Sequence, residues 1–389
     1  MNHLSRPHRL NPRIRGMKCI KCGTLYPVDD YFNGCPHCQD TGDSASLTFQ
    51  YDGPAYILAK QKGLYRYCQF LPYEDIVTLG EGDTPMLQLP ALAKELGVSK
   101  LYTKNEFQNP TGSHKDRMNP FITARASQAG YHTVTCASSG NEAASLAAYA
   151  AAEGLTCVNV STKSIPLFWK NANIASGAKL VLTDTPALRL EYQREKMKDG
   201  WYCATNLMDI PTSSSPFGIQ GYKTIAFELY EELGAELPEY IFIPTCRGDL
   251  LYGIYEGFQD LIKENYLDFM PHLVACEPFP RLELILTQGY DHKEKFSGES
   301  TYTSSIGGNT ATYQSVCAIK GSNGFAVSAP DADIFQAVKS MGRYGLFLET
   351  SSAIVYPCIK NALMSGLMPS NSSVMFILTS NGYKNIQTL

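Results

Sequence analysis

Short apolar runs alternate with longer amphipathic segments from residue 100 to the end of the chain. The short runs are rich in β-branched and aromatic residues, which is typical of strands, and the longer ones repeat apolar residues at helical spacing. The expected strands are Lys100–Lys104, Thr133–Ala137, Thr156–Ser161, Ala178–Leu182, Tyr240–Pro244, His272–Cys276 and Val374–Leu378. The expected helices are Asp116–Ala129, Glu142–Ala152, Phe217–Leu233, Leu250–Lys263, Asp331–Ser340 and Ser352–Met364.

This alternation predicts an α/β fold with parallel sheets, because parallel strands are joined by helical crossovers that cover the sheet. One parallel sheet rarely takes this many strand–helix units, so we expect two lobes. We assign residues 46–100 and 216–389 to a large lobe and residues 101–215 to a smaller one. Residues 17–45 are expected to form a small ribbon. Residues 1–16 carry four arginines and no acid, which suits a targeting peptide or, more plainly, a flexible tail.

The charge balance excludes some classes of function. The chain has 389 residues, with 33 Lys+Arg against 37 Asp+Glu and a net charge of −4. This mildly acidic balance argues against a nucleic-acid partner. No apolar run reaches the roughly 18 residues of a membrane span, and no apolar signal segment stands near the start. Scattered cysteines usually act as small buried hydrophobes in a reducing compartment, so we expect a soluble cytoplasmic protein.

Four of the twelve cysteines form two C-x2-C pairs, Cys19 with Cys22 and Cys35 with Cys38. Two such pairs can place four thiolates around one Zn²⁺ in a tetrahedron, and a glycine adjoins each pair where a tight turn favours it. A closed four-sulfur site leaves no open coordination position, so this zinc would be structural. The alternative is a degenerate ribbon whose thiols stay free or form disulfides.

The segment Asn109–Arg117 reads Asn-Pro-Thr-Gly-Ser-His-Lys-Asp-Arg. Its glycine turn delivers Lys115 to the entrance of a helix, where backbone N–H groups are plentiful. A lysine at such a place can act as a Schiff-base nucleophile. Read alone, Lys115 fits equally well a surface lysine paired with Asp116.

Two further segments run from a strand into a helix. Residues 137–142 read Ala-Ser-Ser-Gly-Asn-Glu, and this geometry gathers N–H donors around an anion such as a substrate carboxylate. An ordinary turn with Asn141 as the helix N-cap explains the same pattern. Residues 244–250 read Pro-Thr-Cys-Arg-Gly-Asp-Leu and can cradle a phosphate.

Together and in this order, these segments resemble the fold-type II pyridoxal-phosphate enzymes, and most closely the threonine synthase family. The resemblance begins at Gly80–Pro85, continues through the lysine segment, the Ser-Ser-Gly-Asn loop and Gly221–Glu228, and ends at Leu378–Lys384. It implies a two-lobed fold like that of the tryptophan synthase β subunit, with pyridoxal 5′-phosphate as cofactor and a small amino acid as substrate. An N-terminal zinc-ribbon-like segment belongs to the same pattern, and homodimers are common among such relatives.

The resemblance also implies roles for individual residues. Lys115 corresponds to the lysine that forms the Schiff base with the cofactor and later moves the α-proton. Asn141 corresponds to the side chain that bonds the cofactor 3′-oxygen, and Thr379 to the hydroxyl that faces the pyridine nitrogen. The residues implied near the cofactor phosphate are His114, Arg247, Gly248, Asp249 and Leu250. The loop implied for the substrate α-carboxylate is Ser138, Ser139 and Gly140.

The departures from the family pattern concern the substrate. Threonine synthases have a threonine that helps hold the substrate phosphate at the position of Glu142, and an asparagine and an arginine at those of Ser215 and Gly218. Each lost charge-assisted contact is worth about 1.5–3 kcal/mol, so phosphate binding should be poor. Glu142 instead favours a neutral or cationic group on the substrate or the incoming nucleophile. It can also act as an acid or base, although a solvated carboxylate at a helix start is the plainer interpretation. Asp249 would repel the cofactor phosphate unless its carboxylate caps the helix or is turned away.

Three hypotheses follow. The leading one is a pyridoxal-phosphate-dependent lyase or synthase that performs β- or γ-elimination or replacement on a small amino acid whose leaving group is not the phosphate of phosphohomoserine. The second is authentic threonine synthase with a phosphate site rearranged around Arg117, Lys163 or Lys170. The third is a catalytically silent relative that uses its ribbon as a binding module, and the retained cofactor residues argue against it.

Overall fold

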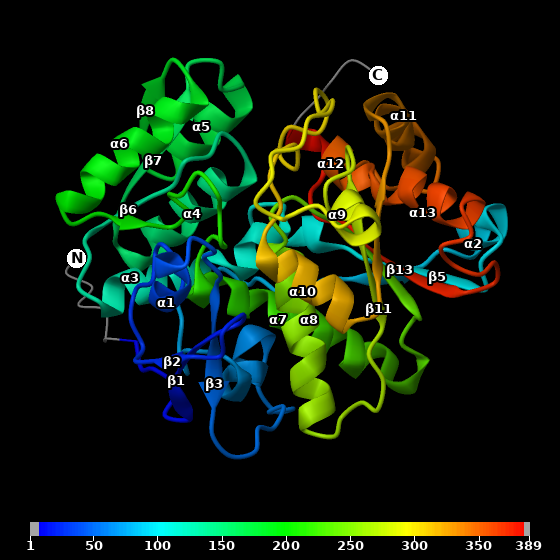
Figure 1. The fold of residues 1–389 in the computed structure, drawn as a ribbon, viewed down its shortest axis with the longest axis horizontal. Helices are drawn as coiled ribbons and strands as arrows, with labels where there is room; N and C mark the ends of the chain where they lie inside the picture. The colour runs from blue at the N-terminus through cyan, green and yellow to red at the C-terminus, as the bar shows by residue number, and fades with distance from the viewer. Residues whose placement is uncertain (1–7, 385–389) are drawn as a thin grey trace. The chain divides into compact units, whose positions relative to one another are not determined.

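The computed structural model describes residues 8–384, which divide into two compact units. The first unit comprises residues 8–82 and 109–224 of the described chain, and the second comprises residues 83–108 and 225–384. Each unit contains a sheet with helices between its strands (Figure 1), parallel in the first unit and parallel except for the β4–β5 pair in the second, so the expected α/β class is confirmed.

The first unit holds a small antiparallel sheet and a parallel one. Its strands are β1 (Ile14–Cys19), β2 (Leu25–Tyr26), β3 (Leu47–Tyr51), β6 (Thr133–Thr135), β7 (Thr156–Thr162), β8 (Lys179–Thr183) and β9 (Tyr202–Cys203). Its helices are α1 (Pro36–Asp40), α3 (Asn119–Gln128), α4 (Asn141–Glu153), α5 (Leu167–Ala175), α6 (Pro186–Lys198) and the start of α7 (Pro216–Leu233), with 3₁₀ helices η1 (Gly63–Phe70) and η3 (His114–Arg117). The antiparallel sheet has the order β2-β1-β3 and the parallel one the order β8-β7-β6-β9.

Residues 8–16 are packed into the first unit. His8 is 8% exposed, and its Nε2 lies 2.8 Å from Glu153 Oε1 on α4. The Asn11 side-chain amide donates to the carbonyls of Cys68, Gln69 and Leu71. The flexible tail expected over residues 1–16 therefore does not describe residues 8–16, and residues 1–7 lie outside the described part of the chain.

The second unit is built on one larger sheet. Its strands are β4 (Met86–Gln88), β5 (Lys100–Lys104), β10 (Tyr240–Pro244), β11 (His272–Glu277), β12 (Phe325–Ser328) and β13 (Ser373–Ile377). Its α-helices are α2 (Pro90–Leu96), the rest of α7, α8 (Asp249–Lys263), α9 (Leu282–Gln288), α10 (Tyr313–Gly321), α11 (Asp331–Gly342), α12 (Thr350–Ala353) and α13 (Val355–Met364). Its 3₁₀ helices are η2 (Glu106–Gln108), η4 (Gly234–Glu236) and η5 (Gly382–Lys384). Within residues 8–384, none of the helices has both the length and the apolar character needed to cross a membrane.

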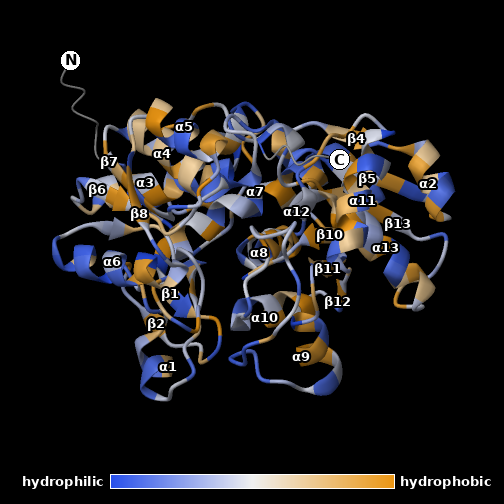
Figure 2. Cartoon of the chain, turned by 90° about the horizontal axis from the view of Figure 1, so that it is seen from above, coloured by the Kyte–Doolittle hydropathy of each residue, from blue (hydrophilic) through white to orange (hydrophobic). Residues whose placement is uncertain are grey.

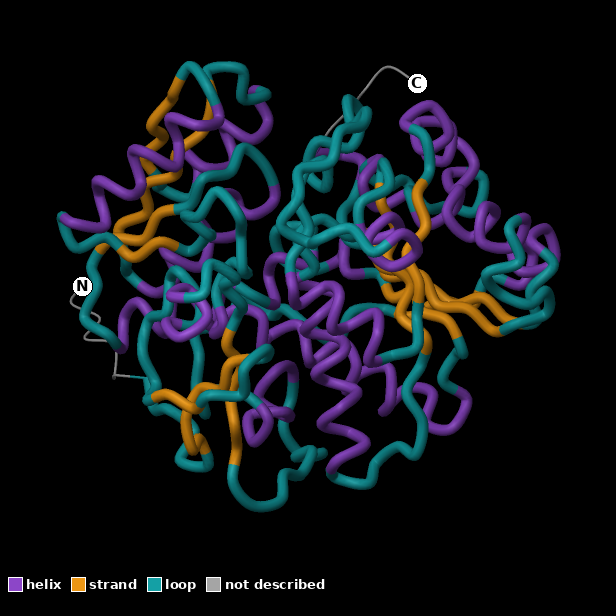
Figure 3. The backbone as a smooth tube through the Cα atoms, in the orientation of Figure 1, coloured by secondary structure: helices purple, strands orange, loops and turns teal. Residues whose placement is uncertain are grey.

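Strand β10 lies inside the sheet of the second unit, whose order is β12-β11-β10-β13-β5-β4. Phe242 pairs with Val274 on β11 and with Phe376 on β13, both in parallel register. Ile241, Phe242 and Ile243 are all fully buried. Since successive side chains point to opposite faces, both faces of this strand are covered, which explains its continuous apolar sequence (Figures 2 and 3).

The compact units differ in their limits from the lobes expected from the sequence. Residues 46–82 belong to the first unit, where β3 pairs with β1 of the ribbon, whereas the sequence pattern groups residues 46–100 with the C-terminal half. Residues 101–108 belong to the second unit, because β5 is hydrogen-bonded to β13. Pairing between distant strands, which local sequence pattern does not encode, sets these limits.

Helix α7 makes backbone contact with the segment that carries the lysine. A Cβ atom on Gly221 would lie 1.8 Å from the carbonyl oxygen of Arg117, the last residue of η3. A Cβ atom on Gly218 would lie 2.5 Å from Met118 Cγ and 2.9 Å from Ile122 Cγ1. The two glycines therefore allow α7 to approach closely enough to support the end of η3 and the start of α3.

We expect Gly221→Ala to lower the stability of the protein by about 3 kcal/mol or more, because the added methyl group overlaps a backbone carbonyl that cannot move without shifting η3. Thermal melting monitored by circular dichroism measures this loss. The matched control is Gly342→Ala in α11, where a Cβ atom would meet nothing within 4 Å. Equal melting temperatures for the two variants would contradict the close approach of α7.

Candidate functional site

The carboxylate of Asp116 fixes the lysine segment in the first unit. Asp116 is fully buried and accepts hydrogen bonds of 2.6 Å each from the Thr111 backbone N–H, the Thr111 hydroxyl and the Ser145 hydroxyl. Thr111 lies in the turn before the lysine, and Ser145 lies on α4. This one buried charge therefore ties the turn to the helix that follows the Ser-Ser-Gly-Asn loop.

The amine of Lys115 pairs with Glu142 on α4. Lys115 Nζ lies 3.3 Å from Glu142 Oε2, and the two side chains are 20% and 8% exposed. The ring of Tyr222 lies 6.0 Å from the same nitrogen and stacks on His114 at 5.6 Å. Besides this pair, the sequence leaves open a pairing with Asp116, whose carboxylate accepts hydrogen bonds from Thr111 and Ser145.

The loop before α4 follows strand β6. Its Gly140 is the N-cap residue of α4, and its backbone N–H donates to the Ser138 hydroxyl at 3.3 Å. Asn141 is the first residue of α4 and not its N-cap. A Cβ atom on Gly140 would meet nothing within 4 Å, so this part of the loop borders open space.

A second cation reaches this loop from α6. Arg189 Nη1 donates to the Ser139 hydroxyl at 3.4 Å, and the Ser161 hydroxyl at the end of β7 donates to the same oxygen at 2.7 Å. The buried thiol of Cys136 lies below this arrangement. Burial raises the pKa of Cys136 well above its usual range, and the charge of Glu142 adds to the shift while Arg189 and Lys115 oppose it.

The positions that match the phosphate-binding residues of threonine synthases are engaged in packing. Ser215 is 3% exposed, and its hydroxyl accepts from the Gly218 N–H at the start of α7. Arg117 is fully buried and donates to the Thr224 hydroxyl at 2.8 Å. Lys163 lies on the surface, 2.7 Å from Asp184, with 67% of its side chain exposed. Arg117, one of the cations considered from the sequence for a rearranged phosphate site, is therefore buried and hydrogen-bonded inside the unit.

In the second unit, the turn after β10 leads into helix α8. Gly248 adopts φ +78°, and a Cβ atom there would lie 2.5 Å from Ser315 Cβ, so glycine is required both for its conformation and for space. The Arg247 carbonyl accepts from the Thr312 hydroxyl at 2.6 Å. Asp249 Oδ1 accepts from the Gln314 side-chain amide at 2.6 Å, so this oxygen is turned toward α10.

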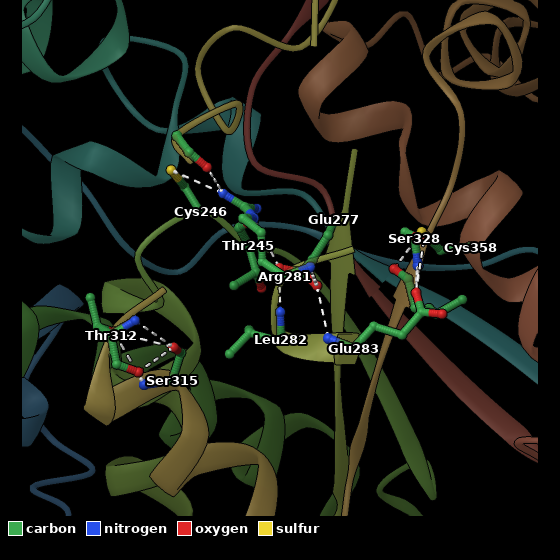
Figure 4. Close-up of polar contacts among 12 residues, drawn as sticks. Thr245, Cys246, Glu277, Arg281, Leu282, Glu283, Thr312, Ser315, Ser328 and Cys358 are labelled. Atoms are coloured by element: carbon green, nitrogen blue, oxygen red, sulfur yellow. Dashed lines mark hydrogen bonds and ion pairs between the residues drawn. The ribbon is translucent and has the colours of Figure 1, made fainter. Parts of the chain in front are cut away.

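A fully buried ion pair holds the turn from the other side. Arg281 Nε lies 3.1 Å from Glu277 Oε1, and both side chains are 0% exposed. The same guanidinium donates to the carbonyls of Thr245 and Gly308. Figure 4 shows Arg281 beside Glu277 and Thr245. Burial raises the pKa of Glu277, whereas Arg281 and the backbone N–H groups around it oppose that shift. The start of the turn is thus held by hydrogen bonds of the Thr245 carbonyl to Arg281 and of the Thr245 N–H to Cys276.

Thr379 lies just beyond the carboxyl end of β13 and is 4% exposed. Its backbone N–H donates to the Ser352 hydroxyl at 2.8 Å. Strand β13 is the hydrogen-bonded neighbour of β10, which precedes the Gly248 turn. Since the carboxyl ends of parallel strands meet at one edge of a sheet, the second unit places Thr379 and the turn at the same edge, where α/β proteins bind ligands.

Residues 77–380 match the family model described as pyridoxal-phosphate dependent enzyme. This chain belongs to that family of pyridoxal-phosphate-dependent enzymes. The match spans the lysine segment, the Ser-Ser-Gly-Asn loop, the Gly248 turn and Thr379.

The relatives agree with this family and with the expected resemblance. The chain is 31% identical to the threonine synthase of Methanocaldococcus jannaschii over 95% of its own length and 92% of that protein. It is 28% identical to the threonine synthase of Methanosarcina acetivorans, over 96% and 93% of the two chains. The structure of threonine deaminase isoform 2 from Solanum lycopersicum matches with a TM-score of 0.65 at 22% identity, covering 78% of this chain and 80% of that one. The two-lobed fold-type II architecture predicted from the sequence is confirmed.

The four clustered cysteines of this family member form a compact group. Their sulfur atoms all lie within 4.8 Å of one another, and no disulfide joins them. The Lys21 and Cys22 backbone N–H groups each point at Cys19 Sγ from 3.4 Å. The predicted pairs Cys19/Cys22 and Cys35/Cys38 therefore meet, as one tetrahedral site requires.

Each unit brings together some of the residues that the sequence singled out. The first unit joins Lys115 to Glu142 and places both beside the loop 138–140, while the second places residues 247–250 and Thr379 at one sheet edge. The sequence did not indicate Arg189, because α6 was not expected and no motif marks this arginine. Its contact with Ser139 spans 50 residues, and only the fold brings the two together.

We expect Asp116→Asn to loosen the lysine segment, because an amide cannot accept all three hydrogen bonds without facing the Thr111 N–H with its own NH₂ group. Hydrogen exchange at the Thr111 amide should accelerate about tenfold or more. The matched control is Asp331→Asn in the second unit, where the carboxylate accepts from the Tyr302 N–H and the Thr303 hydroxyl. Unchanged exchange at Thr111 in the first variant would refute the anchoring role of Asp116.

Proposed function

We propose that this chain is a pyridoxal-phosphate-dependent enzyme that performs β- or γ-elimination or replacement on a small amino acid whose leaving group is not a phosphate. The observation that carries the proposal is the ion pair between Lys115 and Glu142. It keeps a reactive amine of the family motif next to a carboxylate that the threonine synthase pattern does not contain.

Each unit, taken by itself, offers groups of the kind that the cofactor needs. Lys115 is a partly exposed amine able to react with an aldehyde, and Asn141 offers an amide for the 3′-oxygen. The start of α8 after Gly248 offers backbone N–H groups and the positive end of a helix for a phosphate, and the Asp249 oxygen bonded by Gln314 is drawn toward α10. Thr379 offers a hydroxyl for the ring nitrogen. When bound, pyridoxal phosphate supplies an electron sink for the pair released by loss of the α-proton.

Lys115 Nζ is the group proposed to take the α-proton of the substrate. Glu142 Oε2, 3.3 Å away, forms an ion pair with this nitrogen and restrains its rotation. The hydrogen bonds of Asp116 to Thr111 and Ser145 hold the lysine segment against α4. The protein thereby holds the base in one place before a substrate arrives.

The charges of the first unit argue against a phosphate leaving group. The Glu142 carboxylate is 8% exposed, so water screens its repulsion of a dianion only weakly. The position matching the family arginine is Gly218, which faces Met118 and Ile122 and has no space for a side chain. Arg117 is bound to Thr224 inside the unit. A neutral or cationic leaving group suits these surroundings better.

The alternative is authentic threonine synthase acting on O-phosphohomoserine. Two relatives that match over nearly the whole chain carry the name threonine synthase, which favours this alternative. Arg189 beside Ser139 also adds a cation that the sequence pattern did not reveal. The choice between the two depends on the leaving group that the protein accepts.

We also propose that Cys19, Cys22, Cys35 and Cys38 hold one structural Zn²⁺. Four sulfurs within 4.8 Å, with backbone N–H groups directed at one of them, match the donor set of a closed zinc site. The ribbon is also fastened to α3, because Asp30 binds Arg125 at 2.8 and 3.0 Å. The metal would thus stabilise a ribbon that the Asp30–Arg125 ion pair already attaches to α3.

A titration of the pyridoxal-phosphate-loaded protein tests the reaction. The panel is O-phosphohomoserine, O-phosphoserine, O-acetylserine, serine, threonine and diaminopropionate, and the readout is the visible absorbance of the cofactor. We expect a spectral change with a member that carries no phosphate. We expect Lys115→Ala to lose covalent attachment of the cofactor, measured by mass spectrometry after borohydride reduction, whereas the surface variant Lys163→Ala should keep it.

A response to O-phosphohomoserine alone would establish the alternative and overturn the proposed role of Glu142. A protein with no cofactor absorbance at all would be the catalytically silent relative.

For the metal, elemental analysis of the unmodified protein should find about one zinc per chain. We expect the double variant Cys35→Ser, Cys38→Ser to lose this zinc and to melt at a lower temperature while it retains pyridoxal phosphate. The double variant Cys68→Ser, Cys317→Ser removes two half-buried thiols outside the cluster and should keep the zinc. An unmodified protein free of zinc would rule the metal site out.

A further inference from the structure

The hydroxyl of Ser139 accepts two hydrogen bonds within the first unit. One comes from the Ser161 hydroxyl at 2.7 Å and the other from Arg189 Nη1 at 3.4 Å. Ser161 is fully buried at the end of β7, and Arg189 projects from the first turn of α6. These two elements are brought together by the parallel sheet, in which β7 lies between β6 and β8.

These two contacts determine where the Ser139 proton can go. A serine hydroxyl has one proton to donate and two lone pairs to accept with. Ser161 and Arg189 use both lone pairs, so the proton of Ser139 is directed away from them. A charged donor on one side of a hydroxyl also strengthens the hydrogen bond that the hydroxyl donates on the other side. Ser139 is therefore an oriented and polarised donor, suited to an anionic acceptor.

The neighbouring residue shows where that acceptor has room. Gly140 follows Ser139 directly, and a Cβ atom on it would meet nothing within 4 Å. Its own N–H is occupied by Ser138, and α4 begins at the next residue, Asn141. A small anion at this loop would meet the Ser139 hydroxyl and the positive N-terminal end of a 13-residue helix.

We propose that Arg189, acting through Ser139, is a positioning residue for the α-carboxylate of the amino-acid substrate. The proposal rests on the proposed function, since it needs an amino acid at this loop. Glu142 stands at the start of α4, two residues after Gly140, and would repel a carboxylate bound at this loop. The positive charge of Arg189, held at Ser139, offsets that repulsion.

Binding of two probes that carry no leaving group tests the proposal. L-Alanine has the α-carboxylate and L-alaninamide lacks it, and calorimetry on the pyridoxal-phosphate-loaded protein gives the dissociation constant of each. We expect Arg189→Gln to weaken L-alanine binding by roughly ten- to a hundredfold and to leave L-alaninamide unchanged. Ser161→Ala should weaken L-alanine binding by less, because Arg189 still orients Ser139. Lys198→Gln removes the same charge from the exposed end of α6 and should change neither constant.

The cofactor absorbance and the melting temperature of Arg189→Gln, measured without amino acid, should equal those of the unmodified protein. Unchanged L-alanine binding in this variant would overturn the proposal while leaving the proposed function intact. The proposal would also fail if only O-phosphohomoserine lost affinity, since Arg189 would then serve a distal phosphate, or if both probes weakened equally. An unmodified protein that binds no L-alanine would overturn both proposals.

Discussion

The buried carboxylate of Asp116 is the interaction on which the arrangement of the first unit depends. A charge with no exposure to water is tolerated only when donors satisfy it, and here Thr111 and Ser145 supply three hydrogen bonds. The adjoining Lys115 pairs with Glu142, which lies on the same helix, α4, as Ser145. The position of the candidate base thus depends on a carboxylate that holds the backbone of its segment against α4.

In the second unit, buried charges are satisfied by an ion pair. Arg281 and Glu277 are both fully buried, and the guanidinium also bonds the carbonyls that flank the Gly248 turn. Breaking such a pair by removing one partner usually costs about 3–5 kcal/mol, because the remaining charge is left unpaired. In each unit, a network of buried polar groups fixes the backbone of a candidate ligand-binding segment. The network is centred on Asp116 in the first unit and on Arg281 in the second.

Much of the fold could be predicted from the sequence, because strands buried on both faces have a strong local pattern. The limits of Lys100–Lys104 and Tyr240–Pro244 match those of β5 and β10. Helix α6 was missed because it is mostly exposed and lacks an apolar stripe. The motif residues of the candidate site could be found by their order, but the partner of Lys115 could not. That partner and Arg189 depend on contacts between distant elements, which no local pattern encodes.

The close packing around Gly218 has a consequence for how this position can change. Helix α7 packs so tightly on Met118 and Ile122 that the single substitution Gly218→Arg cannot be accommodated. An arginine here would first require smaller residues at 118 and 122, and those would leave cavities while residue 218 was still glycine. Any stepwise route to a charged side chain at this position therefore passes through a less stable protein.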